Sequence, residues 1–170
     1  AKLAHYRASV LRSAASGALS LESSGSEESQ RPPREDGRAL LSRLHELRRA
    51  RWTGRGKYRE PAAAEAPSLA KLPRHWVWAT VDELSIKVSD GVHKKPTYVS
   101  HGIPFVTVKN LTATDGISFA ELNYISAEDH AEFIKRTKPE RGDILVSKDG
   151  TLGVVRLIET DKVFSIFVSV

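Results

Sequence analysis

The residues that could carry chemistry in this 170-residue chain are polar side chains that follow short apolar runs. They fall in three stretches, Lys94–Lys95, Lys109–Thr112 and Lys148–Thr151. Lysine suits phosphate oxygens, asparagine can bond adenine through two hydrogen bonds, and threonine can contact either a phosphate or a base. Loops carried by a rigid sheet are where recognition usually occurs. The recurrence of three such loops, rather than any single residue, therefore indicates a recognition surface.

The sequence offers few residues for catalysis. It has no Cys and six scattered His, none of them in a His-x-x-x-His spacing. It also contains no Gly-x-Ser-x-Gly motif and no phosphate-binding loop ending in Gly-Lys-Ser/Thr. Glu140, Asp143 and Lys148 are the one set that a metal-dependent nuclease could use. Charged residues are routine at an Asp-Gly turn such as the one beside Lys148, so this set stays an alternative.

Short strands must position the three loops. Asp143–Ile158 reads as a hairpin, because Ile144–Ser147 and Leu152–Ile158 are joined at Lys148–Gly150 and Asp-Gly between apolar runs favours a tight turn. Ile103–Val108 reads as a strand in which Pro104 requires a sheet edge or the strand start. Two helices are expected: one that a capping box at Thr80–Glu83 opens and that runs through Ile86, and one at Ala127–Thr137 that Ser126 caps and Pro139 stops. Loops are expected at 89–100 and 110–118. The remaining expected strands are Trp76–Thr80, Asn123–Ile125 and Val163–Val170. We therefore expect a mixed α/β (α+β) unit with short strands.

Helices and tethers precede that unit. Residues 1–21 form a helix candidate, since Leu3, Tyr6, Val10 and Ala14 recur at steps of three and four and share one face; Gly17 weakens its last turn. Residues 22–37 have almost nothing apolar to bury, which predicts a mobile linker. Further expectations are a helix at Arg38–Trp52 capped by Asp36 and ended by Thr53–Gly54, and an Ala/Pro-rich tether at 61–67.

The net charge of +5 is unevenly distributed. Residues 31–60, called the basic stretch below, hold ten Arg or Lys and four Asp or Glu, whereas residues 71–170 hold thirteen of each sign. Nucleic acid is one partner for such a stretch, and a solvated helix face is the other interpretation. No apolar run approaches the ~20 residues that span a bilayer, and the N-terminus lacks a signal-peptide core, so we expect a cytoplasmic protein. The absence of Met and the apolar run at 163–170 lead us to expect a segment of a longer chain.

Several motifs resemble the DNA-specificity subunit of type I restriction–modification systems. Leu72–Leu84 (Leu-Pro-Arg-His-Trp-Val-Trp-Ala-Thr-Val-Asp-Glu-Leu) resembles the opening of a target recognition domain in that family. Gly102–Leu111, Tyr124–His130 and Arg141–Gly153 are similar to its later signatures, in the same order. Ala1–Leu19 resembles the end of the conserved helix that separates the two recognition domains, although Ala14-Ala15-Ser16 stands where an aromatic residue is usual.

The resemblance implies a non-catalytic subunit of a larger complex. Two recognition domains would read the halves of a split site in double-stranded DNA, while long helices dock the modification subunits. Those subunits bind S-adenosylmethionine and methylate adenine, and a restriction subunit uses ATP, with Mg, to translocate and cut DNA. This chain itself would bind no cofactor. Its expected parts are the end of the spacer helix at 1–21, a basic variable linker with a short helix at 22–71, and a C-terminally truncated recognition domain at 72–170.

The expected functional residues follow from the loops and the helix. Leu3, Tyr6, Val10 and Ala14 are the candidates for docking a partner subunit. The expected DNA-contacting residues are Lys94, Lys95, Thr107, Lys109, Asn110, Thr112, Lys148, Asp149 and Thr151. Two other classes remain open: a protein–protein adaptor whose basic stretch is merely solvated, and the small metal-dependent nuclease.

Overall fold

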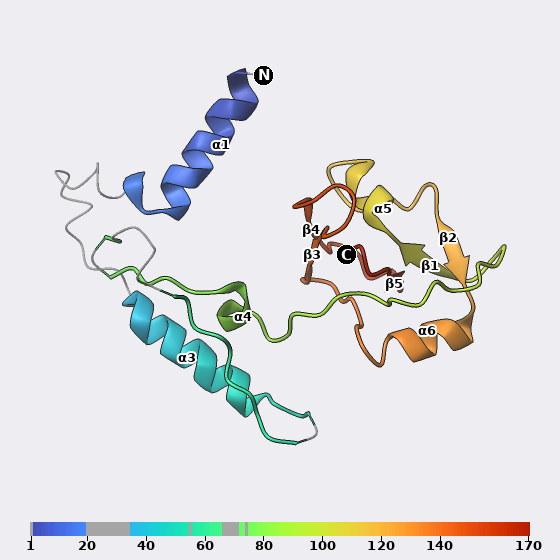
Figure 1. Cartoon of the computed structure of the whole chain (residues 1–170), viewed down its shortest axis with the longest axis horizontal. Helices are drawn as coiled ribbons and strands as arrows, with labels where there is room; N and C mark the ends of the chain where they lie inside the picture. The colour runs from blue at the N-terminus through green and yellow to red at the C-terminus, as the bar shows by residue number, and fades with distance from the viewer. Residues whose placement is uncertain (1, 20–34, 55, 66–71, 74) are drawn as a thin grey trace. The chain divides into compact units, whose positions relative to one another are not determined.

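A computed structural model of the chain describes residues 2–19, 35–54, 56–65, 72–73 and 75–170. The chain divides into two compact units, one within residues 1–88 and one formed by residues 89–170 (Figure 1). The described residues contain helices and two small sheets, so the expectation of a mixed α/β protein is confirmed at that level. The expected boundary at residue 72 stays a prediction.

The first unit begins with helix α1 (Lys2–Ala15), which is shorter than the expected helix at 1–21. The helix ends where Gly17 adopts a left-handed φ of 74° and donates its N–H to Ala14 O at 3.1 Å. Glycine takes this conformation without a steric penalty, which confirms its predicted role at the end of the helix. The linker expected at 22–37 falls largely at residues 20–34, outside the described part of the chain, as do residues 66–67 of the expected tether.

Helix α3 (Gly37–Ala50) begins at the predicted cap. The Asp36 carboxylate accepts the N–H of Arg38 at 2.9 Å and also bonds His75 Nδ1 at 3.0 Å. These bonds, from His75 first and then from the backbone, lower the pKa of Asp36. Gly37 donates its own N–H to His75 O, so the chain around residue 75 returns to the start of α3.

The expected strand at Trp76–Thr80 is wrong. A strand needs a hydrogen-bonded neighbour, and the described part of residues 1–88 contains no second strand to provide one. The segment leads instead into α4 (Val81–Leu84), where Thr80 and Glu83 form the predicted capping box. Helix α4 ends at Leu84 rather than Ile86. Arg48 of α3 bonds Asp82 Oδ1 at 3.0 Å and joins the two helices.

The second unit is built on a three-stranded sheet with the order β2-β1-β5. Strand β1 (Ile103–Val106) pairs antiparallel with β2 (Asn123–Ile125) and parallel with β5 (Ser165–Ile166). Because β1 is central, the sheet-edge placement of Pro104 is wrong and the strand-start alternative holds. The parallel register begins one residue later, at Phe105 with Ser165, so the missing N–H of Pro104 removes no bond from that ladder.

The hairpin of β3 (Ile144–Val146) and β4 (Val155–Leu157) is present, but its turn differs from the prediction. A two-residue Asp-Gly turn needs positive φ at both residues. Gly150 has a φ of 74°, whereas the φ of Asp149 is not positive. The strands are instead joined by a wide loop in which Ser147 and Val154 still pair through a backbone bond of 3.0 Å.

Three other expected elements change in length or type. Residues 108–112 form a short helix, α5 (Val108–Thr112), where a loop was expected from residue 110. Helix α6 (Ala127–Phe133) starts at its predicted cap, with Ser126 Oγ accepting from Asp129, but ends before Pro139 is reached. The strand expected at Val163–Val170 reduces to β5 because only Ser165 and Ile166 keep the ladder with β1.

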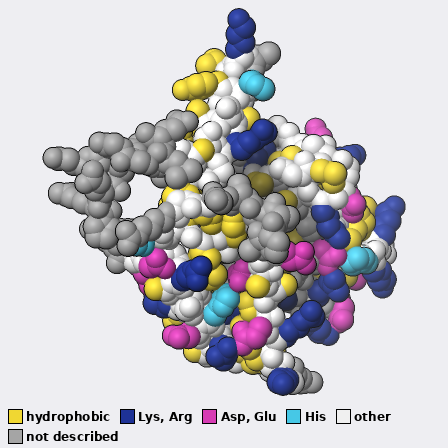
Figure 2. Space-filling view, turned by 60° about the vertical axis from the view of Figure 1, so that its left-hand side comes forward, with side chains coloured by type: hydrophobic (Ala, Val, Ile, Leu, Met, Phe, Trp, Pro, Cys, Tyr) yellow, Lys and Arg dark blue, Asp and Glu magenta, His cyan; other side chains and the backbone are white. Residues whose placement is uncertain are grey.

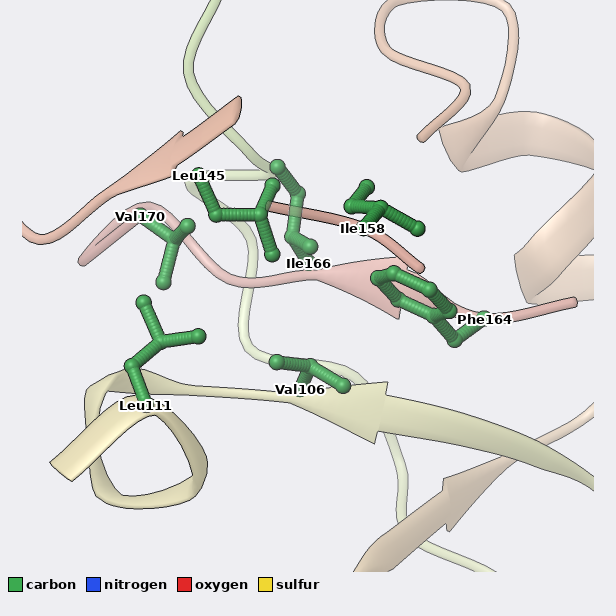
Figure 3. Packing of buried hydrophobic residues seen from close by; sticks show 7 residues of the cluster. All are labelled: Val106, Leu111, Leu145, Ile158, Phe164, Ile166 and Val170. Carbon is green, nitrogen blue, oxygen red and sulfur yellow. The ribbon is translucent and has the colours of Figure 1, made fainter. Parts of the chain in front are cut away.

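The core of the second unit consists of two clusters of buried side chains. Val106, Leu111, Phe164 and Ile166 belong to the larger cluster, which also contains Leu145, Ile158 and Val170 (Figure 3). They come from β1, α5, the hairpin and the C-terminal segment, so apolar burial fixes these elements against one another. The smaller cluster contains Val92, Phe105, Ile125 and Phe133 and holds the start of the unit and α6 to the sheet.

Candidate nucleic-acid interface

Residues 165–170, called the central segment below, bring the three predicted recognition loops together. Val92 N–H donates to Ile166 O at 3.1 Å, and Val168 N–H donates to Val92 O at 3.0 Å, which attaches the loop at 89–100. Ser169 then receives the other two loops. Its hydroxyl accepts the N–H of Val108 at 3.3 Å and its carbonyl accepts the N–H of Lys148 at 2.9 Å. The three loops therefore meet along one short stretch of chain.

Gly91 permits this close approach. A Cβ atom at this position would lie 2.3 Å from Ile166 O and 2.4 Å from Phe167 O. Both atoms are backbone, so neither can turn aside as a flexible side chain would. Only glycine fits between the loop and the central segment here. The one sequence signal is the Asp-Gly pair at 90–91, which is equally typical of an ordinary turn.

The hairpin loop takes its shape from a buried serine. Ser147 is 2% exposed, and its hydroxyl donates to Thr151 O at 2.5 Å while accepting the N–H of Val154 at 2.8 Å. Lys148, Asp149 and Thr151 are exposed around this anchor. The side chains predicted to contact DNA in this loop thus lie on a fixed backbone.

Asn110 has a different position from the one expected of a base-reading residue. It is 6% exposed, its Oδ1 accepts the N–H of Thr107 at 2.9 Å, and its Nδ2 donates to Ser118 O and Glu121 O at 3.3 and 3.2 Å. Its amide is therefore occupied in shaping α5 and the loop that follows. Thr107 donates its hydroxyl to the same Asn110 oxygen at 3.1 Å, so it belongs to the same internal arrangement.

Lys109 and Thr112 of α5 are exposed, as are Lys94 and Lys95 in the first loop. Thr112 donates its hydroxyl to Val108 O and Lys109 O within its own helix, at 3.2 and 3.1 Å. A Cβ at Gly150 would be 3.7 Å from Val108 Cγ1, which shows that α5 and the hairpin loop lie close together.

The strongest electrostatic feature of the second unit is a group that we call the Asp90 cluster, consisting of Asp90, His93, Arg136 and Lys148. One carboxylate oxygen of Asp90 accepts from Arg136, and the other lies 2.7 Å from His93 Nε2 and 3.0 Å from Lys148 Nζ. Arg136 first, then Lys148, hold the pKa of the Asp90 carboxyl far below its usual range. The cluster unites the first loop, the end of α6 and the hairpin loop.

Sequence reasoning missed Asp90, His93 and Arg136. Arg136 lies 46 residues after Asp90 and Lys148 lies 58 residues after it, so no local pattern joins them. The spacing Asp-x-x-His was the only signal, and it is common in solvated loops. Lys148, which was predicted, contacts the first loop through the Asp90 carboxylate that it shares with His93.

The structure does not bring the nuclease set together. Asp143 precedes β3, where its Oδ2 accepts the N–H of Glu140 at 2.9 Å, whereas Lys148 follows the other end of that strand and pairs with Asp90. An extended strand rises about 3.3 Å per residue, so Asp143 and Lys148 at its two ends lie well apart. Among the described residues, no three His, Cys, Asp or Glu side chains are placed to hold a metal ion.

In the first unit, the predicted docking face of α1 is open to solvent. Leu3, Tyr6 and Val10 are 84%, 69% and 38% exposed, and Ala14 is also exposed. Helix α1 has no buried residue, so this apolar stripe is not covered by the described part of the chain.

The basic stretch is partly neutralised within its own unit. Arg43 pairs with Glu35 at 2.8 Å, Arg48 with Asp82 at 3.0 Å, and Arg49 with Glu60. Figure 2 likewise shows Lys and Arg side chains interspersed with Asp and Glu on the visible face. These three arginines have structural partners, which favours the solvated-face interpretation for them.

Within the described ranges, none of the helices has the length and apolar character that crossing a bilayer requires. Comparison of the chain with family models, curated proteins and solved structures gave no match.

Proposed function

We propose that this chain recognises double-stranded DNA as the specificity subunit of a type I restriction–modification complex, with residues 72–170 belonging to a target recognition domain. The observation that carries the proposal is the meeting of three polar loops along the central segment, with Lys94, Lys95 and Lys148 on them. A rigid sheet that presents several lysine-bearing loops at one place is suited to contact phosphates and base edges together.

The internal contacts separate the predicted residues that are free to contact DNA in the proposal from those that are left out of it. Lys94, Lys95, Lys109 and Lys148 are exposed lysines and would contact phosphate, while Asp149 and Thr151 on the hairpin loop would lie near base edges. Asn110 and Thr107 are left out of the proposed contacts because their polar atoms hold α5 in place. Thr112 remains a candidate because it is exposed, and a threonine methyl group suits the methyl of thymine.

The chain would act with partners. The open apolar stripe of α1 would dock a modification subunit, which binds S-adenosylmethionine and methylates adenine, and a restriction subunit would supply ATP- and Mg-dependent cleavage. This division of labour leaves recognition to the chain and chemistry to the other subunits. The same stripe would serve a non-catalytic adaptor, so DNA binding is the property that separates the two functions.

The test is selection from random duplexes by the chain together with its modification subunit, at two salt concentrations. We expect enrichment of a split sequence. Lys94→Gln with Lys95→Gln should weaken binding to all duplexes alike and lower the salt slope by about 0.9 for each phosphate that the variant no longer neutralises. Asp149→Ala and Thr151→Ala should instead change the enriched sequence, at about 1–3 kcal/mol of discrimination for each base contact.

Lys57→Gln is the control for the single variants Lys94→Gln and Lys95→Gln, because Lys57 is an exposed lysine of the basic stretch in the other unit. An equal effect of Lys57→Gln and the loop lysines would mean non-specific attraction of the whole chain to phosphate. Absence of binding at both salt concentrations would overturn the proposal and favour the adaptor.

A further inference from the structure

The sequence contains four Asp-Gly steps, at 36–37, 90–91, 115–116 and 149–150. In such a step the backbone nitrogen of the glycine can attack the side-chain carboxyl of the aspartate before it. Glycine has no Cβ, so nothing on the glycine side hinders this attack. A hydrogen bond that holds the nitrogen or the carboxyl in another place opposes it. The contacts of the four steps therefore determine which of them can react.

Two of the steps are protected at both groups. Asp36 Oδ2 lies 3.0 Å from His75 Nδ1, and the N–H of Gly37 donates to His75 O at 2.9 Å. At the second step the carboxylate is bound by the other members of the Asp90 cluster, and the N–H of Gly91 donates to Val170 O at 3.0 Å. Both groups would have to give up hydrogen bonds before either step could react.

The step at Asp115 is protected at one group. The N–H of Gly116 donates to Thr114 Oγ1 at 3.3 Å. Arg156 holds the same turn by donating to Thr114 O at 2.7 Å and to Gly116 O at 3.1 Å. Within the part of the chain that the structure describes, the Asp115 carboxylate has no hydrogen-bond partner. This step is therefore intermediate.

The step at Asp149 differs from the other three. Among the described residues, neither the Asp149 carboxylate nor the N–H of Gly150 has a hydrogen-bond partner, and both residues are exposed. The bonds that anchor the hairpin loop lie on either side of the step, at the N–H of Lys148 and at the carbonyl of Thr151. The two reacting groups are left without restraint between these anchors.

We infer that Asp149–Gly150 is a site of isoaspartate formation, a spontaneous modification of the backbone. The Gly150 nitrogen bonds to Asp149 Cγ, and the hydroxyl of the neutral carboxyl leaves as water with the N–H proton, which closes a succinimide ring. Water then opens the ring. Where it breaks the bond between the Gly150 nitrogen and the original Asp149 carbonyl carbon, that nitrogen regains a proton and that carbon becomes a carboxylate. The backbone then runs through the former side chain and is one methylene longer.

The modification changes the shape of the loop and leaves its charge as it was. A carboxylate remains at residue 149, but it is attached directly to Cα, while the longer backbone shifts Gly150 and Thr151. The consequence for DNA rests on the proposed function, in which Asp149 and Thr151 would lie near base edges. There we expect an altered sequence preference with an unchanged salt slope, because no phosphate contact gains or loses charge.

The first arm of the test ages the folded 170-residue chain in water labelled with heavy oxygen, in a mildly acidic buffer. Each ring opening leaves one labelled oxygen atom, so mass spectrometry of peptides counts the events at all four steps. We expect the most label at Asp149, less at Asp115 and several-fold less at Asp36 and Asp90. Resistance to a protease that cuts only at normal aspartate identifies the isoaspartate product. Equal labelling of the Asp149 and Asp90 peptides would overturn the inference.

A urea-unfolded sample is the control for neighbouring sequence, because unfolding removes the contacts of all four steps. Labelling at Asp36 and Asp90 should rise several-fold on unfolding, whereas labelling at Asp149 should change least. A rise at Asp149 as large as the rise at Asp90 would show that the fold protects both steps alike, which contradicts the inference.

The second arm compares duplex selection by fresh and aged chain, each with its modification subunit. Asp149→Glu is the matched variant, since its longer side chain would have to close a larger ring and does so far more slowly. Aged wild type should select different sequences from fresh wild type, whereas the variant should select the same sequences at both ages. Unchanged selection by modified wild type would overturn the consequence for DNA. If the chain is modified at Asp149 but binds no duplex at either age, the proposed function fails and the modification site remains.

Discussion

His130 is the clearest case in which one residue's environment sets a measurable property. It belongs to α6, and its Nδ1 lies 2.8 Å from the buried hydroxyl of Ser165 in β5. Burial disfavours the charged imidazolium and lowers the pKa of His130 from its ordinary value of 6.5. The folded state therefore binds a proton less readily than the unfolded chain.

We predict that the second unit loses stability as the pH falls below about 6.5. Below that value the unfolded chain takes up a proton that folded His130 resists, so the free energy of unfolding decreases until the lowered pKa is passed and then levels off. Urea unfolding followed by circular dichroism from pH 8 to pH 5 would show this slope. His130→Asn keeps a hydrogen-bonding group but does not titrate, so its profile should be flatter. An unchanged slope in that variant would assign the effect to another group.

A second prediction concerns Gly91. Gly91→Ala should destabilise the second unit by about 1–3 kcal/mol, because the added methyl would meet two backbone carbonyl oxygens of the central segment. Gly116→Ala is the control, since a Cβ there would meet nothing within 4 Å. It should change the free energy of unfolding by no more than about 0.5 kcal/mol. Equal effects of the two substitutions in chemical denaturation would contradict the close approach at Gly91.

At the level of elements, local capping could be predicted and loop shape could not. Asp36, Thr80 and Ser126 were predicted as caps because a cap depends on residues within three positions of it. The hairpin turn was predicted as a tight Asp-Gly turn, but the bonds of Ser147 and Ser169 widen it. Ser169 lies far along the chain, so no local pattern could have signalled its effect.

Helix α5 provides the third prediction. Asn110→Ala should reduce stability by about 1–3 kcal/mol, because the buried Asn110 amide makes part-buried hydrogen bonds with the carbonyls of Ser118 and Glu121 and with the N–H of Thr107, and all of them are lost. Thr112→Ala, on the exposed side of the same helix, should cost no more than about 0.5 kcal/mol. Thermal unfolding of both variants measures the difference. A stable Asn110→Ala variant with altered DNA preference would restore Asn110 as a base-reading residue.

At the scale of the whole molecule, the mixed α/β class and the order of most elements could be predicted from periodicity and turn residues. The assembly of the candidate interface could not. Lys94, Lys109 and Lys148 were predicted separately, whereas their neighbourhood depends on the pairing of β1 with β5 and on the Asp90 cluster. Both arise from contacts between residues far apart in the chain.

The fourth prediction tests the independence of the second unit. Both core clusters lie within residues 89–170, so this fragment should fold alone and give amide NMR signals for β1, β5 and α6 that match those of the whole chain. A fragment of residues 72–170, which starts at the predicted domain boundary, should give the same signals and add those of residues 72–88. If only the longer fragment folds, the boundary at residue 72 is the functional one.

The central segment also determines when the interface can form during folding. It lies after all three loops in the chain, and its parallel pairing joins Phe105 to Ser165 across about 60 residues. Closing so long a loop is slow, because its entropy must be lost before the contacts form. Until residues 165–170 dock, the loops have no common support, and the apolar side chains of β1 are without cover. The candidate interface should therefore appear late and in one step with the core, and a ribosome-bound chain that has not yet released this segment should lack the proposed DNA binding.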